Sequence, residues 1–375
     1  MMLRNFLNKA RNKSRLVSTV LLNLLIINVV GCTSESQPVA EVPQLTSQQH
    51  DQLLLKTKHA MLALDLSQVD KLSSTIDVNR ALPDNSSLLA WAVETQTPEL
   101  VSLLLDKGAT ADIANGNRFS PMILACRYGN PDIINALLDH GGNPNSAIDD
   151  GTTAFQLCAG SASTDILARM INEGARISAA NSAGQTALMW AANFGNTANL
   201  NFLIEAGADI NAQTQQGYSP LFFAIKSQNL DTVKTAISSG ANVFATANDG
   251  TTAAQLGVYT HNYAFLTWYV SELDLLMSPG AINTTLTAFD REGYQLLHAA
   301  VIANQPELVS ALLARGANPN QISQPSSLKW RYEANFKTEA YLPPQQTPVE
   351  IAEQQQLDAI SAVFEGWQNS QQAQL

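Results

Sequence analysis

Histidine and cysteine are the side chains of this sequence best suited to metal binding or nucleophilic chemistry, and both are few and scattered. Histidine occurs at positions 50, 59, 140, 261 and 298, and cysteine at positions 32, 126 and 158. The sequence contains no Ser-His-Asp order, no phosphate-binding glycine loop and no two-Cys-plus-His metal spacing. It therefore predicts no catalytic residue, no metal site and no cofactor, and we expect that the protein is not an enzyme.

Cys32 ends the segment whose composition suggests a covalent modification. Basic residues are spread over residues 1–15, a mostly apolar run covers residues 16–30, and the small residue Gly31 precedes Cys32. This is the three-part layout of a secretory signal peptide. The apolar run is shorter than the roughly 20 residues that a membrane-spanning helix needs, so a permanent transmembrane anchor is disfavoured.

The segment Val29-Val30-Gly31-Cys32 resembles a bacterial lipobox, in which the cysteine is acylated and becomes the mature N-terminus. The resemblance implies that residues 1–31 are a lipoprotein signal peptide and that 32–46 are a flexible tether. Several acyl chains on one cysteine anchor a protein stably, whereas one chain does not. Thr33 in place of Asp implies the outer membrane, with the protein facing the periplasm. The alternative is a plain signal peptide in which Cys32 has no role.

Charge is divided unevenly along the chain. Residues 1–34 contain five basic residues and no acidic residue, and the remainder carries 16 basic and 32 acidic side chains, a net charge of −16. Phosphate backbones and anionic lipids are bound by Lys and Arg. The acidic charge of the remainder therefore predicts that the protein does not bind nucleic acid. It also predicts that the protein contacts the membrane only through the lipid on Cys32.

Glycines recur with a constant step of 33 residues. One series occupies positions 108, 141, 174, 207 and 240, and a second occupies 151, 184, 217 and 250. Each glycine of the first series follows an apolar stretch of helical spacing, where a residue in the left-handed conformation would end a helix. Equal steps of this length indicate stacked structural repeats, because one such unit buries its apolar face only against its neighbours.

The second glycine series leads into a recurring motif. The stretches Gly217-Tyr-Ser-Pro-Leu-Phe-Phe-Ala and Gly293-Tyr-Gln-Leu-Leu-His-Ala-Ala resemble the Thr-Pro-Leu-His-x-Ala signature of ankyrin repeats. The signature proline survives only at Pro121, Pro220 and Pro348, and the histidine only at His298. The resemblance implies an all-α repeat solenoid of helix-turn-helix units joined by β-turn or hairpin fingers, with His298 in a structural role.

About nine units cover residues 47–367, and we expect the last residues, 368–375, to fray. The unit boundaries are 47–80, 81–114, 115–147, 148–180, 181–213, 214–246, 247–286, 287–322 and a terminal unit from 323. Extra residues near Tyr263–Ser278 predict a lengthened second helix. Further extra residues at about 324–346 predict a lengthened hairpin finger, with a disordered loop as the alternative.

Two smaller predictions concern individual side chains. Ser219 and Thr186 occupy positions at which they can cap a first helix. Cys126 and Cys158 fall at adjoining positions of neighbouring first helices. Because helix axes pack ~8–10 Å apart and a disulfide needs Cα atoms roughly 4.4–6.8 Å apart, we expect two buried thiols rather than a disulfide.

The ankyrin resemblance also implies where a partner binds, namely on a concave face formed by finger tips and exposed first-helix ends. The residues at those places are Phe119, Arg127, Tyr128, Phe194, Tyr218, Lys226, Tyr259, Arg291 and Tyr294, with Trp330 and Tyr332 of the extra finger. Aromatic and arginine side chains most often anchor protein interfaces. The alternative for about half of these residues is packing between repeats. Asp149, Asp150 and Asp249 are expected to form turns.

These observations favour one function over two others. The first hypothesis is a membrane-tethered adaptor in the bacterial cell envelope that binds a protein of unknown identity in its groove. The second is an assembly or maturation factor for a periplasmic enzyme, and the third, disfavoured by the absence of catalytic spacing, is an enzyme.

Overall fold

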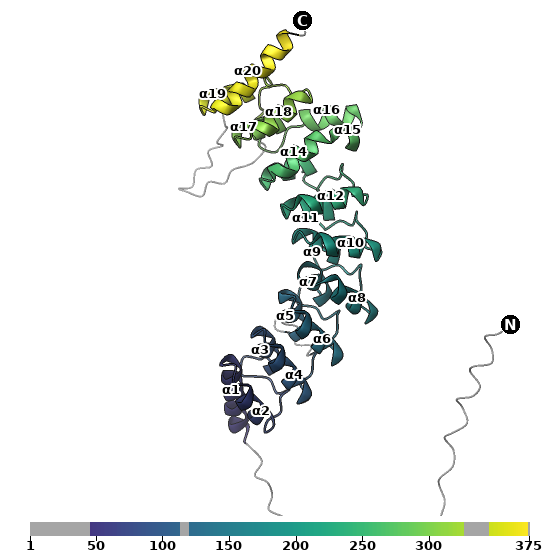
Figure 1. The fold of residues 1–375 in the computed structure, drawn as a ribbon, viewed down its shortest axis with the longest axis vertical. Coiled ribbons are helices and arrows are strands. Elements are labelled where there is room, and N and C mark those ends of the chain that lie inside the picture. Colours follow the sequence, from purple (N-terminus) through teal and green to yellow (C-terminus); the bar gives the residue numbers. More distant parts are fainter. Residues whose placement is uncertain (1–45, 113–119, 326–344, 374–375) are drawn as a thin grey trace, which may run out of the picture. The chain divides into compact units, whose positions relative to one another are not determined.

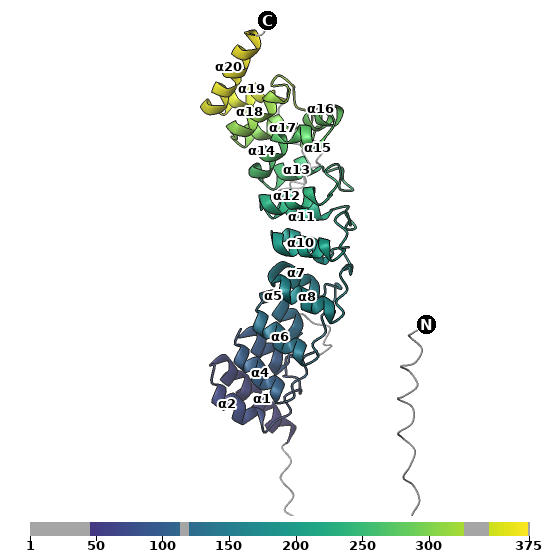
Figure 2. The ribbon, with the colours of Figure 1, turned by 45° about the vertical axis from the view of Figure 1, so that its right-hand side comes forward.

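Helices in antiparallel pairs make up most of the part of the chain that the structure describes. A computed structural model describes residues 46–112, 120–325 and 345–373, and residues 47–375 form one unit. Within these ranges nine pairs follow one another (Figures 1 and 2). The pairs are α1 (Ser47–Leu62) with α2 (Leu66–Ser73), α3 (Leu88–Glu94) with α4 (Pro98–Asp106), α5 (Pro121–Tyr128) with α6 (Pro131–Asp139), α7 (Ala154–Ser161) with α8 (Thr164–Asn172), α9 (Ala187–Asn193) with α10 (Thr197–Glu205), α11 (Pro220–Lys226) with α12 (Leu230–Ser238), α13 (Ala253–Tyr259) with α14 (Tyr263–Ser271), α17 (Leu296–Ile302) with α18 (Pro306–Ala314), and α19 (Pro348–Gln354) with α20 (Asp358–Gln372). This order confirms the all-α repeat solenoid.

Side-chain caps begin several of the first helices. Thr153, Thr252 and Thr347 each form a capping box with the residue three positions later. The prediction that Ser219 and Thr186 cap their helices through their hydroxyls is wrong, because neither hydroxyl bonds a described group. At Ser219 the backbone carbonyl accepts the N–H of Phe222 at 2.9 Å, which is the bond that the hydroxyl would have made.

The glycines with a step of 33 end the second helices, as predicted. Gly207 has a φ of +93°, and no atom lies within 4 Å of the position that a Cβ would occupy. Its role is therefore conformational, since an L side chain rarely adopts this φ. The residue 33 positions after Gly240 is Leu273, which begins the helix α15. The glycine series is therefore interrupted at this point, and the next repeat begins later.

The extra residues after this point form two additional helices, which corrects the prediction of one lengthened second helix. α14 has the usual nine residues and is followed by α15 (Leu273–Leu276) and α16 (Pro279–Thr287). Pro279 explains the break, because a proline pushes the preceding residue out of the helical region. Ser278 accordingly has an extended backbone, with ψ of 156°.

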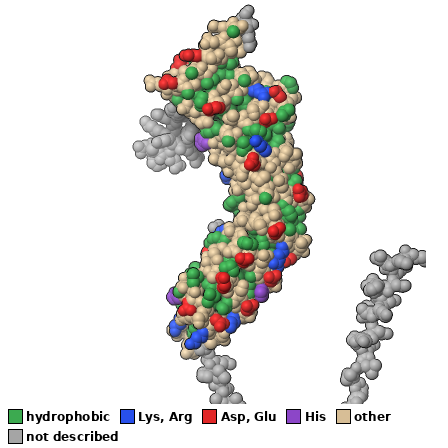
Figure 3. Space-filling view, viewed as in Figure 1, with side chains coloured by type: hydrophobic (Ala, Val, Ile, Leu, Met, Phe, Trp, Pro, Cys, Tyr) green, Lys and Arg blue, Asp and Glu red, His purple; other side chains and the backbone are tan. Residues whose placement is uncertain are grey.

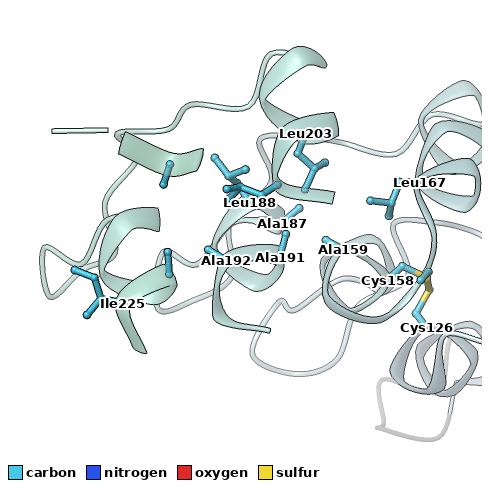
Figure 4. Packing of buried hydrophobic residues seen from close by; sticks show 14 of the residues in the cluster. Cys126, Cys158, Ala159, Leu167, Ala187, Leu188, Ala191, Ala192, Leu203 and Ile225 are labelled. Atoms are coloured by element: carbon cyan, nitrogen blue, oxygen red, sulfur yellow. A yellow bond between two sulfur atoms is a disulfide. The ribbon is translucent and has the colours of Figure 1, made fainter. Parts of the chain in front are cut away.

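Small side chains let neighbouring first helices approach one another. Ala191 and Ala192 of α9 (labelled in Figure 4) and Ala224 of α11 are fully buried in a core that continues through all the pairs. Because each pair buries its apolar side chains largely against the pairs before and after it, stability comes from stacking.

The fingers that join the pairs are hydrogen-bonded to one another. The backbone N–H groups of Ser182, Gln215 and Asn248 donate to carbonyls of the preceding finger at 2.7–2.9 Å. Within three fingers a single antiparallel bridge closes the turn, as between Ala180 and Thr186. The fingers thus form a second continuous connection along the stack, beside the helices.

A disulfide joins α5 to α7, so the prediction of two free thiols at Cys126 and Cys158 is wrong. Their Cα atoms are 4.4 Å apart, and the sulfur atoms are visibly bonded in Figure 4. The prediction compared helix axes with Cα atoms. Cα atoms lie about 2.3 Å from the helix axis, so on facing sides of two helices they come much closer than the axes do.

The C-terminal end differs from expectation in one respect. α20 continues to Gln372 instead of fraying after Trp367, consistent with the good helix propensity of glutamine. The predicted hairpin at 324–346 falls mostly outside the described residues, but its ends meet: the N–H of Ser323 donates to the carbonyl of Gln346 at 3.0 Å. Among the described helices none combines the length and the apolar character that crossing a membrane requires.

Candidate protein-binding surface

The predicted contact residues that the structure describes occupy equivalent places in different repeats. Arg127, Lys226 and Tyr259 stand next to last or last in their first helices, and Tyr128 and Phe194 follow one position later in the repeat. Tyr218 and Tyr294 each follow the glycine of a finger. Because the first helices stack, equivalent positions form rows. We call this set the first-helix face: Arg127, Tyr128, Phe194, Tyr218, Lys226, Tyr259, Arg291 and Tyr294.

Charge is sparse on the middle of this face. The first helices α7, α9, α11, α13 and α17 carry one lysine and no arginine, aspartate or glutamate, and that lysine is Lys226. In the view of Figure 3, charged side chains are dense over the N-terminal pairs and few over the middle of the stack. A weakly charged surface in a strongly acidic protein is easier to desolvate, as a protein interface requires.

Tyr128 lies at the N-terminal part of the first-helix face and is 47% exposed. Its hydroxyl donates a hydrogen bond to Oε2 of Glu94 at 2.6 Å, and this bond raises the pKa of Tyr128. The bond joins α5 to α3, so it holds the ring at the surface in one orientation. The neighbouring Arg127 is exposed.

Phe194 is the most exposed aromatic ring of the face, at 60%. It stacks on Trp190 with 6.1 Å between ring centroids, and it lies over Gly160 of the preceding repeat. A Cβ at Gly160 would come within 2.7 Å of the Phe194 ring, so the glycine makes room for it. Phe194 thus packs between repeats on one side and presents its other side to solvent.

Tyr218 and Lys226 belong to one pocket of about 260 Å³ between the repeats of α11 and α13. Phe222, which is 2% exposed, packs against Tyr218 with 5.6 Å between ring centroids. The lining residues are Tyr218, Phe222, Phe223, Lys226, Leu256 and Thr260. An engineered apolar cavity of about 150 Å³ binds benzene, so this pocket is large enough for an aromatic ring.

Tyr259 and Arg291 are also brought together. The guanidinium carbon of Arg291 lies 4.4 Å from the centroid of the Tyr259 ring, a cation–π contact. Burial raises the pKa of the Tyr259 hydroxyl. Beside them Asp290 accepts the N–H groups of Glu292 and Tyr294, and burial raises the pKa of its carboxyl group. Tyr259 is thus partly buried.

A family model described as ankyrin repeats (3 copies) matches residues 59–148, 142–214 and 221–323, which is more than half of the chain. The chain belongs to the ankyrin-repeat family. No curated protein matches it significantly. Ankyrin repeats form protein–protein interaction domains, so a protein is the expected class of partner for the first-helix face of this ankyrin stack.

The signature histidine of the ankyrin repeat has a structural role here, as predicted. His298 is fully buried; its Nδ1 accepts the N–H of Gln295, and its Nε2 therefore donates to the carbonyl of Gln346 at 3.2 Å. Burial lowers the pKa of His298, which favours the neutral ring. The ring ties the start of α17 to the loop that leads into the last ankyrin unit.

The acidic residues of the ankyrin fingers lie in turns, as expected. The N–H of Gly151 donates to the carbonyl of Ile148 at 2.8 Å, which places Asp149 and Asp150 in one turn. Asp150 and Asp249 accept the backbone N–H two residues later at 2.8 and 3.0 Å. Asp149 is exposed. Within residues 46–112, 120–325 and 345–373 no three His, Cys, Asp or Glu side chains are grouped so that they could hold a metal ion.

Sequence reasoning missed a second pocket in the irregular ankyrin unit. A cavity of about 290 Å³ lies among α13, α14, α16 and α17, where Met277, Ala281 and Leu296 contribute to its lining. The available signal was the 43-residue step between Gly250 and Gly293, which places extra chain at this point.

Three of the predicted contact residues, Phe119, Trp330 and Tyr332, lie outside the described residues.

Proposed function

We propose that this protein is an adaptor of the bacterial cell envelope, tethered by a lipid on Cys32, that binds a partner protein on the first-helix face. The observation that carries the proposal is the pocket that Tyr218 and Lys226 line on a face otherwise poor in charge. Interface anchors are typically aromatic and basic side chains in desolvated pockets. Phe194 and Tyr128 add exposed aromatic surface to the same face.

Two features support an envelope location. The N-terminal segment has the composition of a lipoprotein signal peptide, and a disulfide links Cys126 to Cys158. Disulfides persist in oxidising compartments such as the periplasm and are rare in the cytosol. An acidic body linked to the membrane by residues 32–46 would remain in the aqueous phase, because it does not bind anionic lipid.

Affinity purification of the tethered full chain tests the binding function. The double variant Tyr218→Ala, Tyr259→Ala should lose the main co-purifying protein, since truncating an interface anchor costs at least ~2 kcal/mol of binding. Its stability should fall only modestly, because both rings are partly exposed and the Tyr259–Arg291 contact contributes about 0.5–1 kcal/mol. Retained binding by the double variant would contradict the proposal. Substoichiometric, transient recovery would instead favour an assembly or maturation factor.

The tether has its own test. Cys32→Ser should release the protein from membranes, since burial of acyl chains contributes ~0.8 kcal/mol per CH₂ group. Variant protein that stays with the membrane after high-salt washing and is processed as before would contradict the lipid anchor without affecting the binding function.

A further inference from the structure

The pocket between α11 and α13 combines an apolar interior with one cation. Phe222 and Leu256 line it with apolar side chains, and Tyr218 and Phe223 add aromatic surface. Lys226, the last residue of α11, is exposed at its edge. No ion pair or hydrogen bond joins the Lys226 ammonium group to another residue of the described ranges, so its charge is available to a ligand.

Other cations in the described part of the chain are engaged differently. Lys58, Lys107 and Arg169 form ion pairs with carboxylates at 2.7–3.3 Å. Lys234, in the same repeat as Lys226, lies 5.6 Å from the centroid of the Trp268 ring. Lys226 therefore differs from these residues in standing unpaired beside an apolar pocket.

From this arrangement we infer that the pocket binds an extended partner segment in which an aromatic side chain stands next to an Asp or Glu. The inference rests on the proposed binding function and names the partner's chemistry. The aromatic ring fills the pocket against Tyr218 and Phe222, and the carboxylate pairs with Lys226. Charge complementarity supports this occupant, because Lys226 is the one Lys, Arg, Asp or Glu among the first helices α7, α9, α11, α13 and α17, and an unpaired cation there attracts an anion.

The carboxylate belongs to a side chain within the segment and not to a chain terminus. Terminal carboxylates are captured by clustered backbone N–H groups. Lys226 stands at the C-terminal end of α11, where the free backbone groups are carbonyls and the helix dipole is negative. The lysine is thus the one anion-binding group offered there, which suits a side-chain carboxylate that approaches the ammonium group directly.

Selection from a phage library of random short peptides against the immobilised full chain tests this inference. Enriched peptides should carry an aromatic residue adjacent to Asp or Glu. For the best synthetic peptide, acid→amide and aromatic→Ala replacements should each weaken binding about tenfold. Lys226→Gln should cause a similar loss, Lys226→Arg should restore most of the affinity, and Lys234→Gln, the matched control, should have no effect.

The coupling between the two charges decides the outcome. On the Lys226→Gln protein the acid→amide replacement should cost nothing further. The inference is overturned if that replacement costs as much on Lys226→Gln as on the unmodified protein, if enriched peptides lack the acidic-aromatic pair, or if no peptide is enriched. Capture of a folded partner through Phe194 would survive all three results, so failure here is distinguishable from failure of the proposed function.

Discussion

Arg291 and Tyr259 meet across the irregular part of the stack, with 4.4 Å between the guanidinium carbon and the ring centroid. Tyr259 ends α13, whereas Arg291 lies in the finger before α17, and α15 and α16 intervene in the chain. The contact therefore joins two repeats that the inserted helices separate in sequence. It restores across the insertion a connection that adjacent regular repeats make through their fingers.

We expect this contact to stabilise the fold measurably. A double-mutant cycle with Tyr259→Leu and Arg291→Gln should give a coupling energy of about 0.5–1 kcal/mol, the value typical of exposed cation–π pairs. Denaturant unfolding of the four proteins provides the measurement. Additive effects of the two substitutions would show that the ring and the guanidinium group do not interact in solution.

The disulfide gives a second prediction. Its reduction should lower the free energy of unfolding by about 2–4 kcal/mol, because the bond constrains the unfolded chain between Cys126 and Cys158, 32 residues apart. Reductant should leave the unfolding midpoint of the double variant Cys126→Ala, Cys158→Ala unchanged. In denatured protein, maleimide should label both cysteines only after reduction. Full labelling without reductant would mean that the thiols are free.

Gly207 tests the assignment of the helix terminators. Gly207→Val should destabilise the protein by ~1 kcal/mol or more, since a β-branched residue fits a φ of +93° badly although space is open around it. Gly280→Ala is the matched control, because Gly280 lies within α16, has equally open surroundings and has no left-handed φ. It should be neutral or stabilising. Equal unfolding midpoints for Gly207→Val and the unmodified protein would require a different repeat register.

Burial of His298 predicts a pH dependence. Burial lowers the pKa of His298 below the ordinary value of 6.5. Below about pH 6.5 the unfolded chain therefore binds a proton at His298, whereas the folded chain keeps the ring neutral until the pH falls further. The stability contributed by the neutral ring is thus present above that pH and is lost as the pH falls toward the folded-state pKa.

Unfolding midpoints measured from pH 7.5 to 5.5 should therefore fall more steeply for the unmodified protein than for His298→Gln. The other histidines are shared by both proteins, so the difference isolates His298. Parallel pH profiles would show that His298 is not buried in its neutral form.

The regular part of the fold was predictable because its cause is local. Gly207 and its equivalents end helices through their own backbone conformation. Those residues can be identified in the sequence without knowing what packs beside them. Pro279 also breaks a helix by a local effect, yet the extra residues before it were expected to form one lengthened second helix.

Features that depend on contacts between repeats were not predictable in the same way. The distance between Cys126 and Cys158 depends on how closely two helices approach, which small neighbouring side chains decide. The pocket around Lys226 requires Leu256 from the next repeat. The positions of Tyr218 and Lys226 in their repeats predicted that both lie on the first-helix face. That they line one pocket follows only from the packing of two repeats in the structure.

Site-specific photo-crosslinking in cells tests protein binding by the first-helix face most directly. A photoreactive phenylalanine replaces Phe194, 60% exposed on that face, or Phe244, 55% exposed in the loop after α12 and outside the face. Similar exposure gives both probes equal access to solvent. The account predicts that the probe at Phe194 captures one predominant protein partner and the probe at Phe244 does not. Equal capture at the two positions, or capture at Phe244 alone, would contradict it.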